Sequence, residues 1–221
     1  MIRLEDIVKT YQMGRNSLTV LKGINLEIKD GEMVAIMGPS GSGKTTLLNL
    51  IGCLDKPTSG KYYFADKEVS RLGSSELAEL RGQKIGFIFQ TFNLLSRLSA
   101  LTNVEIGMMY AGGINREFAR EALTKVGLTA RMNHRPIELS GGEQQRVAIA
   151  RAIVKNPSIF LADEPTGQLD SRSGKEIMSI LSALRTERNI SILVVTHDAS
   201  VANQCQRIIR LKDGEIVSED H

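Results

Sequence analysis

Apolar residues fall into two alternating patterns along the chain. Short apolar runs predict buried parallel strands at Met33–Met37, Ile85–Phe89, Ile159–Ala162 and Ser191–Thr196. Apolar residues at helical spacing predict helices at Leu47–Ile51, Glu117–Val126, Glu143–Lys155 and Ile177–Leu184. Because strands alternate with helices, the pattern predicts an α/β fold with a mainly parallel sheet and helices on its faces.

Other stretches predict turns and antiparallel pairs. Residues 24–28 alternate apolar with polar and end at Asp30-Gly31, which predicts a strand that enters a tight turn. Arg207–Leu211 and Glu215–Val217 predict a hairpin around Asp213-Gly214.

Two local patterns complete this picture. Phe118, Ala122 and Val126 are spaced by four, which predicts one shared apolar helix face. Residues Pro57–Gly60 predict a loop.

Composition restricts the class of protein. With 221 residues, 42% of them hydrophobic, the chain can form one well-packed α/β domain with a small subdomain. Its net charge of +3 is too small to indicate nucleic-acid binding. Cys53 and Cys205 form no CxxC pair, so we expect neither a metal site nor a disulfide framework, and a reducing compartment.

No segment predicts a membrane span. The apolar stretch Ile106–Ile114 is far shorter than the roughly 20 residues that a transmembrane helix needs. The first residues lack the apolar core of a signal peptide. We therefore expect a cytoplasmic protein whose membrane role, if it has one, comes through a partner.

The first chemical motif is a phosphate loop, Gly38–Thr45, which matches G-x-x-x-x-G-K-[ST] between a predicted strand and a predicted helix. Its glycines let backbone N–H groups surround phosphate oxygens, and the helix directs its positive end at the same anion. Lys44 can reach the β- and γ-phosphates, and Thr45 can ligate Mg²⁺. The predicted ATP-binding residues here are Gly38, Pro39, Ser40, Gly41, Ser42, Gly43, Lys44, Thr45 and Thr46.

Two acidic residues follow a second buried strand. Asp163 and Glu164 end the run Ile159–Ala162, and taken alone they could be ordinary loop residues in solvent. Beside a phosphate loop, Asp163 is expected to hold Mg²⁺ through a water molecule. Glu164 is then placed to orient or deprotonate the attacking water.

A second anion-binding turn opens the helix after Leu139. Ser140-Gly141-Gly142 supplies backbone N–H groups, a hydroxyl and a helix dipole. One nucleotide hardly needs two such sites from one chain, so this turn is expected to read the γ-phosphate held by another copy. Ser140 can also simply cap the helix, and both roles can hold together.

These motifs resemble the ABC ATPase family over nearly the whole chain. The resemblance implies a P-loop NTPase core with an antiparallel β subdomain and an inserted helical subdomain, within one domain of residues 1–221. It divides the chain into a core of residues 1–89 and 157–221 and a helical subdomain of residues 90–156.

The resemblance also implies roles for further residues. Tyr11 is similar to the aromatic residue that stacks on adenine, and Gln90 to the Q-loop glutamine that senses Mg²⁺, water and the permease. Asp170 lies in a segment similar to the D-loop, and His197 is similar to the switch histidine that contacts the γ-phosphate. Each alone could be an ordinary surface residue; their order and spacing support the assignment.

Two positions depart from the family pattern. The family's signature motif is the stretch Leu139–Glu143, and Glu143 stands where this motif commonly has Gln. Its negative charge would either weaken the binding of an ATP held between two copies or be offset by the helix dipole. Gln168 stands in the D-loop where a small residue is more usual. The residues assigned to the ATP of the opposing subunit are Ser140, Gly141, Gly142, Glu143 and Asp170.

Three segments resemble the branch that includes lipoprotein-releasing and macrolide-exporting ATPases: residues 51–60, 85–95 and 161–167. This resemblance implies an ATP-dependent homodimer that drives a membrane permease from the inner face, with a periplasmic or extracellular adaptor as a further partner. Catalysis would use Lys44, Gln90, Glu164 and His197, with Thr45, Gln90 and Asp163 at Mg²⁺.

Two other functions remain open on the sequence. ATP cycling through a permease could regulate an enzyme outside the membrane. A DNA-repair or chromosome-organising ATPase has the same head, but such heads carry long coiled coils or zinc insertions, which this chain lacks. We expect no nucleic-acid partner.

Overall fold

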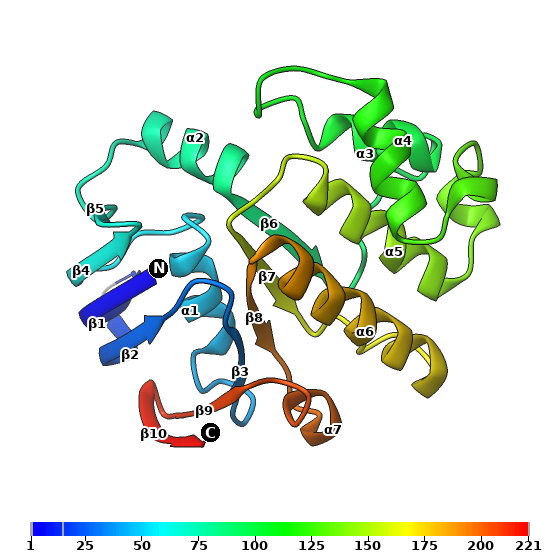
Figure 1. The fold of residues 1–221 in the computed structure, drawn as a ribbon. Helices are drawn as coiled ribbons and strands as arrows, with labels where there is room; N and C mark the ends of the chain where they lie inside the picture. The colour runs from blue at the N-terminus through cyan, green and yellow to red at the C-terminus, as the bar shows by residue number, and fades with distance from the viewer. Residues whose placement is uncertain (1, 15, 221) are drawn as a thin grey trace.

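The structure, a computed structural model, describes residues 2–14 and 16–220 and forms two sheets flanked by helices (Figure 1). The strands are β1 (Ile2–Met13), β2 (Asn16–Ile28), β3 (Met33–Met37), β4 (Ser59–Phe64), β5 (Lys67–Glu68), β6 (Ile85–Phe89), β7 (Ile159–Asp163), β8 (Ser191–Val195), β9 (Arg207–Lys212) and β10 (Glu215–Asp220). The α-helices are α1 (Lys44–Ile51), α2 (Ser74–Lys84), α3 (Ala100–Ile106), α4 (Arg116–Lys125), α5 (Gly141–Ile153), α6 (Ser171–Arg188) and α7 (Ala199–Ala202), and two short 3-10 helices are η1 (Thr129–Arg131) and η2 (Pro136–Glu138).

The central sheet has the order β10-β9-β3-β8-β7-β6. Strands β9, β3, β8, β7 and β6 run parallel, and β10 pairs antiparallel with β9 in the predicted hairpin. All five residues of β8 are buried, as its continuous apolar run requires. The prediction of a mainly parallel sheet is therefore confirmed.

The second sheet, β2-β1-β4-β5, is antiparallel. Alternate residues of β1 and β2, among them Leu4 and Leu26, pack with Leu47 of α1 and Ile36 of β3 in one hydrophobic cluster. This sheet therefore packs against the phosphate-loop helix α1. The predicted loop at residues 57–60 is partly wrong, because β4 begins at Ser59.

The helices α3, α4 and α5 gather at the end of the molecule opposite the antiparallel sheet (Figure 1). A second hydrophobic cluster joins them and includes Leu101, Leu123 and Ile149. The predicted shared face of α4 is wrong for one residue: Ala122 is buried, but Phe118 is 54% exposed. The buried face of α4 is formed by Ala119, Ala122 and Leu123, and Phe118 lies outside it.

Helix α6 is the longest helix of the described structure and is amphipathic. It is 18 residues long, and its buried residues lie on one side while Arg172, Lys175 and Glu176 are exposed on the other. Among residues 2–14 and 16–220, no helix is both long and apolar enough to cross a bilayer.

Candidate active site

The strand ends of the central sheet bring the sequence motifs together. Ile36, Val195, Asp163 and Phe89 lie in register across β3, β8, β7 and β6. Because the strands are parallel, the residues that follow them meet at one edge of the sheet. These residues are the phosphate loop, His197, Glu164 and Gln90.

The phosphate loop leaves the first turn of α1 open to an anion. Gly41 (φ +80°) and Gly43 (φ +104°) take left-handed conformations that favour glycine. In the described structure no side chain caps Gly43, and the first turn of α1 carries no acid. The Lys44 Nζ donates hydrogen bonds to the carbonyls of Gly38 and Pro39, at 2.8 Å each. The ammonium therefore lies over the loop where a phosphate would be bound.

Asp163 has the environment of a carboxylate that needs a cation. Burial raises its pKa, repulsion from Glu164 raises it further, and Lys44 partly opposes both. Within the described residues, no three His, Cys, Asp or Glu side chains gather into a metal site of their own. Mg²⁺ is commonly held by one or two protein ligands together with phosphate oxygens, so Asp163 and the Thr45 hydroxyl of α1 suit it.

Glu164 is held by three donors. Its φ of +46° is rare for a non-glycine residue, and such strain clusters at active sites. Its carboxylate accepts hydrogen bonds from the Thr196 hydroxyl (3.1 Å), the His197 backbone N–H (3.0 Å) and the His197 Nδ1 (2.6 Å). The hydrogen bond to Glu164 raises the pKa of His197. With Nδ1 on Glu164, Nε2 is the ring nitrogen of His197 that remains for contact with a ligand.

Gln90 lies close to Glu164 through Gly167. A Cβ at Gly167 would lie 2.9 Å from the Gln90 Nε2 and 3.4 Å from the Glu164 Cβ. A side chain at this position would therefore displace the Gln90 amide from its place beside Glu164. The structure therefore brings together the four residues predicted to be catalytic, Lys44, Gln90, Glu164 and His197, at one sheet edge.

Tyr11 is fixed by two residues that the sequence interpretation missed. Its hydroxyl donates to Asp55 Oδ2 (2.8 Å), and the Lys9 Nζ lies 4.7 Å from its ring centroid and 2.6 Å from Asp55 Oδ1. Burial and Asp55 raise the pKa of Tyr11, while a contact with Thr46 of α1 lowers it. The ring therefore lies beside the phosphate-loop helix. Lys9 and Asp55 carry no motif, so only the fold could bring them together.

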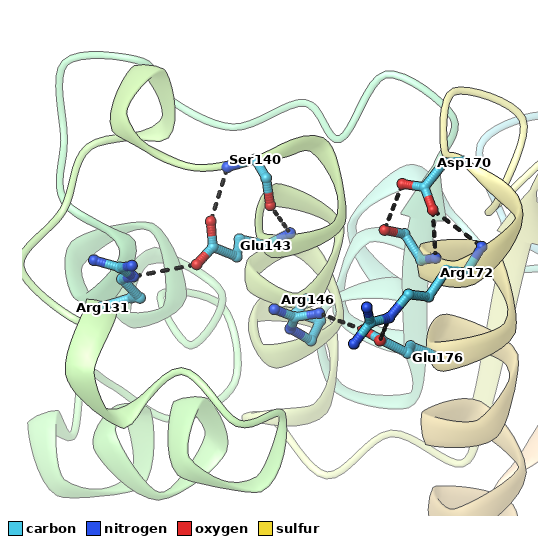
Figure 2. Close-up of polar contacts among 8 residues, drawn as sticks. Arg131, Ser140, Glu143, Arg146, Asp170, Arg172 and Glu176 are labelled. Carbon is cyan, nitrogen blue, oxygen red and sulfur yellow. Dashed lines mark hydrogen bonds and ion pairs between the residues drawn. The ribbon is translucent and has the colours of Figure 1, made fainter.

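The signature turn, Ser140–Glu143, is closed by its own side chains (Figure 2). Ser140 Oγ accepts from the Glu143 N–H (3.3 Å), and the Ser140 N–H donates to Glu143 Oε2 (2.8 Å). Arg131 Nε lies 3.2 Å from Glu143 Oε1. The Ser140 N–H is the main reason that the pKa of Glu143 is lowered. Arg131, a residue that the sequence interpretation missed, is thus the counter-charge of Glu143.

The glycines of this turn face the D-loop segment. A Cβ at Gly141 would lie 3.3 Å from Leu169 Cδ2, and one at Gly142 would lie 3.1 Å from Ser173 Oγ. Asp170 caps α6 by accepting from the Arg172 and Ser173 N–H groups, at 3.0 Å each (Figure 2). The signature turn is therefore anchored to the start of α6.

Comparison with known proteins decides the family. Residues 21–167 match the family model described as "ABC transporter". This chain belongs to the ABC transporter family. Its family and its phosphate loop together make it an ABC ATPase that binds ATP, with Mg²⁺ as the usual partner of the phosphate loop. The resemblance read from the sequence is confirmed.

Relatives and solved structures agree with this family. The chain is 50% identical to the macrolide export ATP-binding/permease protein MacB of Syntrophobacter fumaroxidans, covering 99% of this chain and 31% of that protein. It is 51% identical to the ABC transporter ATP-binding protein MJ0796 of Methanocaldococcus jannaschii, covering 100% of this chain and 97% of that protein. The chain thus spans about a third of the length of the MacB proteins it matches.

Among solved structures, a dimeric post-hydrolysis state of MJ0796 bound to ADP and Pi matches with a TM-score of 0.91 and 49% identity, over 100% of this chain and 98% of that one. The CbiO1 protein of Clostridium perfringens, part of the transporter complex CbiONQ, matches with a TM-score of 0.84 and 32% identity, over 99% of this chain and 87% of that one. The predicted P-loop NTPase fold is therefore confirmed.

Proposed function

We propose that two copies of this chain close around two ATP molecules and drive a membrane permease of the export or force-transmitting type. The observation that carries this proposal is the anchoring of the signature turn. Its glycines face Leu169 and Ser173, at the start of α6, and not the phosphate loop of the same chain. A second anion-binding turn in this position suits the γ-phosphate of an ATP held by another copy. The dimeric structure of MJ0796 supports this arrangement.

ATP binding uses the beginning of α1 first and the beginning of α5 of the opposing copy second. The phosphate loop surrounds the β- and γ-phosphates with N–H groups, and Lys44 turns from the carbonyls of Gly38 and Pro39 to the phosphate oxygens. Tyr11 stacks on the adenine. Ser140 of the opposing copy then completes the site from the other side, which excludes water.

Hydrolysis is then a matter of positioning and charge. Thr45, Gln90 and, through a water molecule, Asp163 would hold Mg²⁺, which would supply positive charge beside the phosphates. Glu164 accepts a proton from the water whose oxygen bonds the γ-phosphorus, while the bond between that phosphorus and the β–γ bridging oxygen breaks. His197 holds Glu164 through Nδ1 and contacts the γ-phosphate through Nε2. ADP and phosphate, both anionic, then favour opening.

The relatives support a proposal for the partner and the place of action. The MacB name joins ATP-binding and permease functions in one protein, so we place this chain on the cytoplasmic face, under a permease that exports a lipoprotein, peptide or drug. Regulation of an extracytoplasmic enzyme through such a permease is the alternative.

Leu95 follows the Q-loop residue Gln90, is 49% exposed, and is our candidate for the contact with the permease. Lost co-purification of Leu95→Glu with the permease, at unchanged ATP binding, is the measurement that checks it.

The substitution Glu164→Gln tests the motor role. Without the carboxylate, turnover should fall by at least about 100-fold while ATP binding persists, because positioning groups remain. The variant should then run as an ATP-dependent dimer in gel filtration. Glu187→Gln, an exposed change on α6, is the control and should behave like the wild type. Wild-type turnover in Glu164→Gln, or a monomer with ATP bound, would contradict the proposal.

A further inference from the structure

The chain makes an unusual turn directly after Gln90. Phe92 (φ +58°) and Asn93 (φ +50°) both take the left-handed conformation, which two consecutive non-glycine residues rarely adopt. The Thr91 hydroxyl donates to the Asn93 side-chain oxygen (2.9 Å) within this turn. Such a turn persists only where the surroundings hold it. We call residues 90–93 the Q-loop turn.

Arg151 holds the Q-loop turn from the last turn of α5. Its Nη2 donates to the Phe92 carbonyl (2.9 Å), and its Nη1 donates to the Asn93 carbonyl. Burial lowers the pKa of Arg151, and among the described residues it has no ion-pair partner. Gly107 makes room for it, since a Cβ there would lie 3.1 Å from Arg151 Cγ. A partly buried guanidinium therefore donates to two backbone carbonyls.

The same helix holds the chain on the other side of Gln90. Gln145 is fully buried, and its Nε2 donates to the Pro165 carbonyl (2.6 Å) and to the Phe89 carbonyl (3.4 Å). Phe89 directly precedes Gln90, and Pro165 directly follows Glu164. Helix α5 thus contacts the backbone both before and after Gln90.

We propose that Arg151 is a positioning residue for Gln90, which ties the Q-loop turn to the helix that begins at the signature turn. This inference rests on the proposed function of Gln90 at Mg²⁺ and the attacking water. When ATP draws Ser140 toward the partner's γ-phosphate, α5 moves as one body, and Arg151 carries the Q-loop turn with it. Binding in one site is thereby linked to the placement of Gln90 in the other.

A simpler role for Arg151 is to complete the packing between α3 and α5. That role predicts an effect on folding alone, independent of Gln90. The positioning role predicts that loss of Arg151 acts through Gln90, so the two substitutions should not add.

The experiment compares turnover in Arg151→Met, Gln90→Ala and the double variant at saturating Mg-ATP. Arg151→Met should lower kcat by about 10-fold or more with KM for ATP little changed, as expected when the support of a metal ligand is removed. The double variant should match Gln90→Ala alone. Arg151→Lys, which reaches one carbonyl at a time, should retain intermediate turnover. Arg120→Met, an exposed change on α4, is the control.

Hydrogen exchange supplies a second readout. In Arg151→Met the peptide that spans residues 89–95 should exchange faster than in Arg120→Met, while α4 and α6 remain unchanged. If Arg151→Met does not fold, Arg151→Lys carries the same comparison.

Additive losses in the double variant, or unchanged exchange of residues 89–95, would overturn the inference. Wild-type turnover in Gln90→Ala would overturn it too, and would also refute the proposed role of Gln90. Loss of turnover in Gln90→Ala with none in Arg151→Met would refute Arg151 alone.

Discussion

The beginnings of α1 and α5 resemble each other in sequence and differ in how they are closed. Each helix starts in a glycine-rich turn with a positive dipole end. At α1, in the described structure, no side chain caps Gly43, and Lys44 lies over the loop. At α5, Ser140 and Glu143 cap each other, and Arg131 neutralises the carboxylate.

The difference assigns the two ends different tasks. An uncapped end with a lysine beside it has donors to offer, so it can bind phosphate from a single chain. A capped end with a carboxylate beside it is stable without a ligand, and it offers an incoming phosphate less attraction. The second end therefore suits a phosphate that is already held in place by another copy.

Of the substitutions at the two helix ends, Lys44→Ala should have the largest effect, because it removes the positive charge at the uncapped beginning of α1. We expect ATP affinity to fall by about 1.5–3 kcal/mol, with turnover lost as well. Calorimetric titration with ATP measures the affinity, and Lys125→Ala at the exposed end of α4 is the control. Unchanged affinity and turnover would refute the phosphate-loop assignment.

Glu143→Gln should have a smaller effect, on stability, because it weakens the closed end. We expect a loss of about 1 kcal/mol in the free energy of unfolding at pH 7, the usual scale of a helix cap. Urea unfolding measures it, with Glu121→Gln on α4 as the matched control. Equal stability of Glu143→Gln and the wild type at pH 7 would show that the turn does not depend on this carboxylate.

The same variant predicts a pH dependence. Because the pKa of Glu143 is lowered in the folded chain, its contribution to stability is present above the ordinary value of 4.5 and is lost as pH falls through the folded value. The stability gap between the wild type and Glu143→Gln should therefore shrink below pH 4.5. A gap that stays constant to lower pH would argue against the ionised carboxylate as its source.

Tyr11→Phe should have the smallest effect, because Tyr11 is proposed to contact the adenine and not the phosphates. Loss of the hydroxyl bond to Asp55 frees the ring and should weaken ATP binding by about 0.5–1 kcal/mol. Tyr11→Ala should cost more, about 1–3 kcal/mol, because stacking is lost. Equal affinity of Tyr11→Ala and the wild type would remove Tyr11 from the adenine site.

The sequence predicts strands well where burial is continuous. Met33–Met37 and Ile85–Phe89 match β3 and β6 residue for residue, because both faces of these strands are covered. Helix α2 had no such signal: Leu77 is its one buried residue, so it shows no apolar stripe. Strand β1 was missed because its alternation breaks near Asp6, a left-handed residue at an irregular register.

The residues of the candidate site likewise fall into those that the sequence predicts and those that only the fold reveals. The phosphate loop and Asp163-Glu164 carry their chemistry in consecutive residues, so a motif reveals them. Lys9, Asp55 and Arg131 act through partners far along the chain, and no spacing rule predicts such contacts. The sequence also left open what Glu143 does, since only the fold shows that Arg131 faces it.

The central claim is that the phosphate loop of one copy and the signature turn of another copy contact the same ATP. An ATP analogue with a photoreactive group at its γ-phosphate tests this claim most directly. Glu164→Gln chains of natural mass are mixed with isotopically heavy chains that carry both Glu164→Gln and Lys44→Ala. At an ATP concentration that fills only chains with an intact Lys44, the heavy chains bind little ATP of their own, so label on their residues 140–146 comes from an ATP bound by a light partner. The account predicts such label on the heavy chain. Label in residues 140–146 of light chains alone would show that each signature turn reads its own ATP, and would contradict the account.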